Sequence, residues 1–293
     1  MGWLKLLEAH ERLAGTHWVD TWAALVQRYG TQHPLALAVL GGQSVATPGL
    51  AFLVGYQAAL RALWPSAPQG LGAICATERQ SLRPADLHTR IDGLRLNGQK
   101  DFVTAGEVAD WLLVAARCDA EGEPARLTLT IVYPGEPGVR LHPLAQLPMM
   151  PEIGHSRLEL NNALCERLAG DGWDAYVKPF RSLEDLYVLA ASVAWLHGVG
   201  RDSAWPRGLM LQLVGLLGGC AEASRQGATQ PATHVLLAGL FEQFALLQSS
   251  LTIALQQGAP HWAEAWNRAS GLLDLAASAR AKRLENALGV FAR

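Results

Sequence analysis

The chain has 293 residues, of which 50% are hydrophobic and 17% are charged, and its formal net charge at pH 7 is −2. This composition is typical of a folded protein with a substantial core and excludes a disordered chain. Because the net charge is small and no run of Lys or Arg occurs, a nucleic-acid surface is not expected.

Targeting and metal-binding signals are not found. No window holds enough consecutive uncharged apolar residues to cross a bilayer, and charges interrupt the apolar start of the chain, which argues against a signal peptide. The four cysteines include no C-x-x-C pair, and the nine histidines show no metal-ligand spacing. We therefore expect a cytoplasmic protein without a metal, and we interpret the histidines as structural or surface residues.

The first part of the chain carries helical patterns. Apolar residues with helical spacing, interrupted by Gly and Pro, predict helices over residues 3–13, 18–29, 33–40 and 50–64. Pro65 is expected to end the last of them. These helices form a predicted N-terminal helical region, residues 1–68.

The middle part, residues 69–172, changes to strand signals. Strands are predicted over residues 88–91, 94–96, 100–104, 111–117, 127–132, 139–144 and 156–160. The dipeptides Asp92-Gly93 and Asn97-Gly98 predict tight hairpin turns, because both central positions of such turns need a positive φ. Strands joined by hairpins are antiparallel, so a central antiparallel β-domain of barrel or sandwich type is expected.

From residue 173 to residue 293 the pattern returns to long helices. They are predicted over residues 183–197, 207–225, 231–257 and 261–291, and together they suggest an antiparallel four-helix bundle. The predicted fold class is therefore α+β, with helices on both sides of the β-domain in sequence. The last helix has an apolar stripe, which we expect to be buried in the core, with a subunit interface as the alternative. Its members are Leu272, Leu273, Ala276, Ala279, Leu284, Ala287 and Leu288.

The most specific signal lies between residues 73 and 117. It reads A-I-C-A-T-E, then D-G-L-R-L-N-G-Q-K-D-F-V-T-A-G, then A-D-W-L-L-V-A-A-R. This order of turn dipeptides, lysine, aromatic residue and threonine resembles the middle β-domain of the acyl-CoA dehydrogenase family. Weaker similarity extends over residues 71–173. The chain resembles a shortened, divergent member of that family.

The resemblance implies an FAD cofactor and the oxidation of an acyl-CoA or related acyl thioester, a reaction of fatty acid metabolism. Thr77 matches the family threonine that hydrogen-bonds the flavin ring. Phe102 and Thr104, with Val103 between them, match the residues packed against its other face. The alternative is that these are ordinary strand residues, because Phe, Val and Thr are common in strands. Lys100 is expected to be a solvated strand residue.

The resemblance also suggests a catalytic base. The family's late-loop Y-E-G motif is not found, but residues 183–191 resemble the helix segment L-D-x-E-R-x-x-x-A-A that carries the base in other members. Aligning the two alanines places Asp185 at the base position, one methylene shorter than a glutamate. The alternative is that Glu184 and Asp185 are solvated acids that favour the helix dipole.

Several flavin-binding motifs of the family are missing, so two functions remain open. Arg79-Gln80 follows Thr77-Glu78 where the family has Pro and then G-S-D, and the R-x-x-F-G and Q-x-x-G-G-x-G segments are not found. The first function is that of a flavin-dependent acyl-CoA dehydrogenase-like oxidoreductase. The second is that of a degenerate, flavin-free member serving as a structural or regulatory subunit of a full-length relative. By resemblance, a homodimer or a dimer of dimers is expected.

Overall fold

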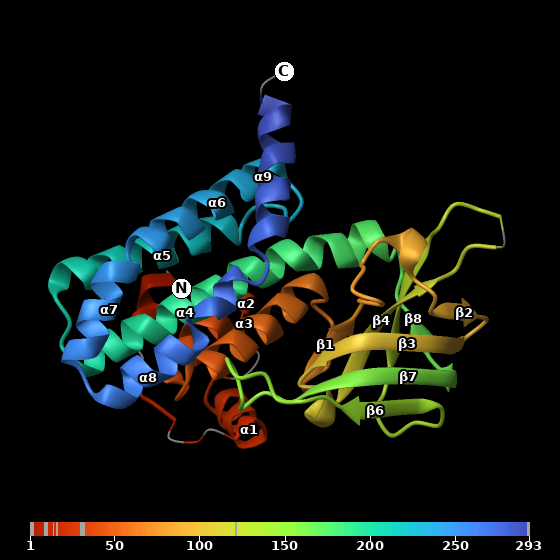
Figure 1. Cartoon of the computed structure of the whole chain (residues 1–293), viewed down its shortest axis with the longest axis horizontal. Helices are drawn as coiled ribbons and strands as arrows, with labels where there is room; N and C mark the ends of the chain where they lie inside the picture. The colour runs from red at the N-terminus through yellow and green to blue at the C-terminus, as the bar shows by residue number, and fades with distance from the viewer. Residues whose placement is uncertain are drawn as a thin grey trace. The chain divides into compact units, whose positions relative to one another are not determined.

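The computed structural model describes residues 3–8, 11–13, 15, 17–29, 33–120 and 122–291. It is an α+β protein with a curled mixed sheet and helical regions before and after it in sequence (Figure 1). The chain divides into two compact units. A helical unit comprises Met1–Ala62, Pro148–Glu152 and Ser182–Arg293, and a β-unit comprises Leu63–Leu147 and Ile153–Arg181.

The described strands of the β-unit form one sheet, in the order β6-β7-β3-β2-β4-β5-β8, with β1 paired to β4. The strands are β1 (Gly72–Cys75), β2 (Arg90–Asp92), β3 (Arg95–Thr104), β4 (Trp111–Arg117), β5 (Leu127–Val132), β6 (Val139–Pro143), β7 (His155–Leu164) and β8 (Glu166–Arg167). The sheet is mixed, because β1 and β2 both pair with β4 in parallel. The predicted α+β fold class with a central β-domain is confirmed, and most strand pairs are antiparallel as expected. The two parallel pairings were not predicted, since hairpin signals report only on strands that are adjacent in sequence.

One of the two predicted hairpin turns is confirmed. Asp92 pairs with Arg95 across the β2–β3 hairpin, and Gly93 has φ = 56°. Asn97-Gly98 instead lies inside β3, at a register shift in the pairing with β7. Gly98 has φ = 149°, and a Cβ there would lie 2.5 Å from the hydroxyl oxygen of Thr89. Gly98 is needed for a bulge and for the close approach of the segment that contains Thr89, rather than for a turn.

The core of the β-unit follows the two-residue period of the strands. Leu96 and Val103 of β3 and Leu158 and Leu160 of β7 lie in one buried cluster with residues of β1 and β4. Side chains two apart on a strand share a face, so this cluster defines the core face of the β3–β7 pair. The 3-10 helices η2 (Pro84–Asp86) and η3 (Gly106–Val108) and the π-helix η4 (Trp173–Val177) lie in the connections.

The helical unit contains both the N-terminal and the C-terminal helices. They are η1 (Trp3–Leu7), α1 (Trp18–Tyr29), α2 (Pro34–Ser44), α3 (Pro48–Leu63), α4 (Lys178–Asp202), α5 (Arg207–Ala223), α6 (Pro231–Leu246), α7 (Gln248–Gln257), α8 (Pro260–Ala269), η5 (Ser270–Asp274) and α9 (Ala277–Phe291). A Cβ on Gly42 of α2 would lie 2.4 Å from the Ala191 carbonyl oxygen, and one on Gly55 of α3 would lie 2.6 Å from that of Tyr187. These glycines let α2 and α3 approach the backbone of α4.

The last two predicted helices are each broken in the structure. The segment predicted as residues 231–257 bends by 45° between α6 and α7, and the segment 261–291 is divided into α8, η5 and α9. The first predicted helix, residues 3–13, is helical only over η1, and residues 9 and 10 lie outside the described part. Of the described helices, none by itself is long and apolar enough to span a membrane. Among them, only the bent pair α6 and α7, taken together, has the length and the apolar composition of a membrane span.

The apolar stripe of the last helix is only partly buried. Leu272, Leu273 and Ala287 are buried as predicted, whereas Leu288 is 50% exposed. Phe291 at the end of α9 is also exposed, and α9 extends past the other helices of its unit in Figure 1. Leu288 therefore does not contribute to the core as predicted, although Ala287 beside it does.

Candidate functional site

A buried ion pair fixes the segment before β2 onto β3. Lys100 was expected to be solvated, but it is fully buried, with its Nζ 2.6 Å from Oε1 of Glu78. Glu78 also accepts hydrogen bonds from the backbone N–H groups of His88 and Thr89. Burial lowers the pKa of Lys100, and the Glu78 charge opposes this only partly. Burial raises the pKa of Glu78, but the Lys100 charge and the hydrogen bonds outweigh it, so that this pKa lies below its usual value.

The same segment places Thr77 beside β3. The backbone N–H of Asp101 donates to the Thr77 carbonyl oxygen at 3.0 Å, and the backbone N–H of Gln80 donates to the Asp101 carboxylate. Arg79 and Gln80 both have positive φ and form a tight turn closed by two hydrogen bonds between Glu78 and Ser81. Thr77 is thereby held next to the residue that precedes Phe102, although the two are far apart in sequence.

A bulge in β3 determines where Phe102 points. The pairing of β3 with β7 shifts register between Lys100 and Val103. Val103 is fully buried in the core cluster, so contact between its side chain and a ligand on the other face is not supported. Phe102 remains 38% exposed, and Thr104 is paired with His155. Bulges commonly re-aim a side chain near a binding site.

His155 of β7 joins Phe102 and Thr104 on this face. Its ring centroid lies 4.5 Å from that of Phe102, with an interplanar angle of 32°. The side chain is buried, and neither ring nitrogen has a hydrogen-bond partner in the described structure. Burial lowers the pKa of His155, and the Ile153 backbone opposes this shift only partly. Sequence reasoning missed this residue because it treated every histidine as structural, although the Gly154-His155-Ser156 segment belonged to the region of family resemblance.

Asp185 belongs to the helical unit, on α4, and it is buried rather than solvated. Its Oδ1 lies 3.0 Å from Nη1 of Arg280, and its Oδ2 is paired with Nη2 of Arg283. Two guanidinium groups favour the ionised carboxylate and occupy both of its oxygens. This geometry supports a structural role for Asp185 and counts against its use as a base.

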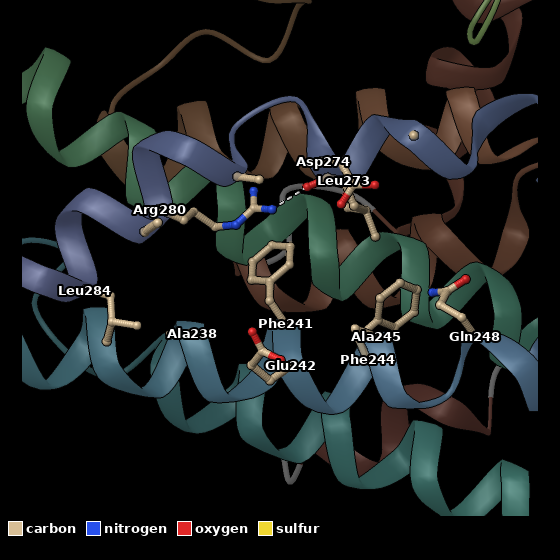
Figure 2. A pocket seen from close by; sticks show the side chains of 13 residues that line it. Ala238, Phe241, Glu242, Phe244, Ala245, Gln248, Leu273, Asp274, Arg280 and Leu284 are labelled. Atoms are coloured by element: carbon tan, nitrogen blue, oxygen red, sulfur yellow. Dashed lines mark hydrogen bonds between the residues drawn. The ribbon is translucent and has the colours of Figure 1, made fainter.

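A pocket of about 560 Å³ lies in the helical unit between α6 and the segment formed by η5 and α9. Figure 2 shows the Arg280 guanidinium directed toward the Leu273 carbonyl, to which it donates at 2.5 Å. The guanidinium carbon lies 3.8 Å from the centre of the Phe241 ring. Because Arg280 also binds Asp185, the pocket borders that ion pair. Among the described residues, no group of three or more potential metal ligands occurs.

Solved structures match this chain over most of its length. Butyryl-CoA dehydrogenase from Megasphaera elsdenii is 14% identical, with a TM-score of 0.66 over 95% of this chain and 87% of that one. The ChsE4-ChsE5 complex from Mycobacterium tuberculosis is 18% identical, with a TM-score of 0.62 over 98% and 91%. The FAD complex of PigA is 13% identical, with a TM-score of 0.57 over 94% and 84%. No protein-family model and no curated protein matches the sequence.

The helices and the curled mixed sheet thus define an α+β fold that this chain shares with the matched structures. More specifically, the chain has the acyl-CoA dehydrogenase fold. At these identities the likeness establishes the fold, and the function must be argued from the site.

The residues on the face of β3 and β7 opposite the core cluster fit a flavin. Phe102 offers an exposed aromatic surface to a planar ring, and the neighbouring His155 carries buried hydrogen-bonding atoms without protein partners. A flavin presents both an aromatic face and polar edges, so one ligand can satisfy both kinds of group. Thr77 lies on the segment that is hydrogen-bonded to Asp101, and Thr104 lies two residues after Phe102 on β3.

Proposed function

We propose that the chain is a flavin-dependent oxidoreductase of the acyl-CoA dehydrogenase type. The observation that supports this most directly is the grouping of Phe102, His155 and Thr104 at the β3 bulge, with Thr77 beside it. This grouping needs a bulge, a tight turn with two positive φ values and a buried ion pair to form. Such locally unfavourable features are concentrated at functional sites.

In this proposal the β-unit binds FAD, which when bound accepts a hydride from the substrate. Phe102 packs against the ring system, and Thr77 and Thr104 offer hydroxyl groups to its polar atoms. The matched butyryl-CoA dehydrogenase supports an acyl thioester as the class of substrate. The three predicted parts, residues 1–68, 69–172 and 173–293, remain a proposed domain division.

Asp185 remains the proposed base, but its use requires both arginines to move. A base must reach the proton that it removes with a free oxygen lone pair. In the structure both oxygens of Asp185 accept from Arg280 and Arg283. The base reaction therefore depends on opening these two ion pairs.

The ion pairs of Asp185 support a second function. A chain whose one proposed base is neutralised can serve as a structural or regulatory subunit without chemistry of its own. The matched ChsE4-ChsE5 structure is a complex, which supports assembly with a relative. The exposed apolar end of α9 supports either that or a homo-oligomer.

The two functions are separated by reaction of the FAD-loaded chain with acyl-CoA thioesters of different length under anaerobic conditions. The enzyme proposal predicts that the flavin absorbance is bleached by at least one thioester. Asp185→Asn should abolish bleaching without releasing FAD if Asp185 is the base. A chain that does not retain FAD favours the flavin-free subunit function, and retained FAD with no bleaching by any thioester refutes the oxidation of an acyl thioester.

A further inference from the structure

His155 combines four features that a structural histidine does not need. Its relative exposure is 1%, and both ring nitrogens lack hydrogen-bond partners among the described residues. It packs against the aromatic ring of Phe102, and its backbone pairs with Thr104. These are two of the residues for which flavin contact is proposed.

A buried polar group without a partner is rare, because it loses its hydrogen bonds to water without replacement. A neutral imidazole has one N–H donor and one acceptor nitrogen, and the lowered pKa of His155 keeps the ring neutral near pH 7. The Ile153 backbone is close enough to oppose this shift but does not meet hydrogen-bond geometry. Either nitrogen can therefore hydrogen-bond a ligand once the ring, which is 1% exposed, becomes accessible to it.

His142 shows what a surface histidine looks like in the same unit. Its Nε2 lies 2.8 Å from Oε2 of Glu159, and its side chain is 51% exposed. It therefore has a partner and access to water, whereas His155 has neither. A purely packing role at position 155 would be served better by an apolar side chain.

We propose that His155 is a positioning residue of the flavin site, which orients Phe102 by ring packing and hydrogen-bonds the bound flavin through a ring nitrogen. This inference rests on the proposed function, because it requires flavin to bind on the β3–β7 face. It assigns a flavin-orienting role to a residue outside the T-E and F-V-T motifs.

The test uses the full-length chain and three substitutions: His155→Phe, His155→Leu and His155→Gln. The affinity for FAD is measured by quenching of flavin fluorescence, and the stability of the flavin-free chain by urea unfolding. We expect His155→Phe to bind FAD about tenfold more weakly, the effect of one hydrogen bond. The same variant should raise the urea midpoint, because an unsatisfied buried group is removed.

The other variants separate positioning from packing. His155→Leu tests the same loss with a smaller side chain if the Phe ring does not fit, and circular dichroism establishes that each variant is folded. His155→Gln, which restores a donor and an acceptor, should recover much of the affinity and of the bound-flavin absorption spectrum. The matched control His142→Phe should leave FAD affinity and spectrum unchanged.

The outcomes distinguish failure of the inference from failure of the function. If the unmodified chain does not bind FAD, both the proposed function and the role of His155 are overturned. If it binds FAD and the folded apolar variants bind equally well with the same spectrum, only the role of His155 is overturned. Weaker binding of the apolar variants, together with rescue by His155→Gln, supports the inference.

Discussion

Removal of the Lys100 ammonium group should strongly destabilise the chain. Lys100→Met leaves the Glu78 carboxylate buried without its cationic partner, since the ammonium lies 2.6 Å from it and both side chains are almost inaccessible. Breaking a buried pair by removing one partner costs about 3–5 kcal/mol. Glu78 keeps hydrogen bonds from the His88 and Thr89 backbone, so we expect a loss of about 3 kcal/mol, the lower end of that range.

Urea unfolding followed by circular dichroism measures this loss as a change in the free energy of unfolding. The double variant Glu78→Gln, Lys100→Met should recover much of it, because no charge is then buried without a partner. The matched surface control is Lys178→Met, whose ammonium pairs with Asp174 but is 54% exposed, and it should change stability by less than about 1 kcal/mol. A loss in Lys100→Met as small as that of the control, or no recovery in the double variant, would refute the reasoning.

Three further predictions concern single residues. The Arg117 hydrogen bonds lower the pKa of Asp119. The ionised Asp119 side chain therefore contributes its full stabilisation above the ordinary carboxylate pKa of about 4, and this stabilisation is lost as the pH falls below that value. From pH 7 to about pH 3, the urea midpoint of the unmodified chain should fall further than that of Asp119→Asn. Gln80 has φ = 63°, so Gln80→Gly should raise the free energy of unfolding by about 1 kcal/mol, and unchanged or lower stability would contradict strain at this turn. Asp185→Asn should lower the free energy of unfolding, measured with urea, by about 3 kcal/mol, because it leaves Arg280 partly buried without its anion. A free energy of unfolding equal to or above that of the unmodified chain would count against the structural role of Asp185.

The fold was largely predictable where the signal is local. The two-residue period and turn residues gave most strand positions, and the Asp92-Gly93 hairpin formed as predicted. The Asn97-Gly98 dipeptide did not form a turn, because a glycine with positive φ suits a bulge as well as a turn. The parallel pairing of β1 and β2 with β4 depends on contacts between distant strands, which no dipeptide specifies.

The candidate site was predictable only in part, for the same reason. Thr77 and Phe102 could be named from a motif, and the structure holds their segments together. The burial of Lys100 could not be foreseen, because the sequence does not show which face of a strand an adjacent segment covers. The partners of Asp185 come from α9, and Arg283 lies 98 residues further along the chain. Pairs at that separation are set by helix packing, which single-sequence patterns do not report.

Binding of flavin to the β3–β7 face is best tested by the visible absorbance of the purified chain after incubation with FAD and desalting, beside two aromatic variants. Phe102 and Tyr133 are both 38% exposed in the β-unit, so Tyr133→Ala is the matched control for Phe102→Ala. If flavin binds to this face, the flavin band is retained in the unmodified chain and in Tyr133→Ala and is lost in Phe102→Ala. No band in the unmodified chain, or an equal band in Phe102→Ala, would contradict it.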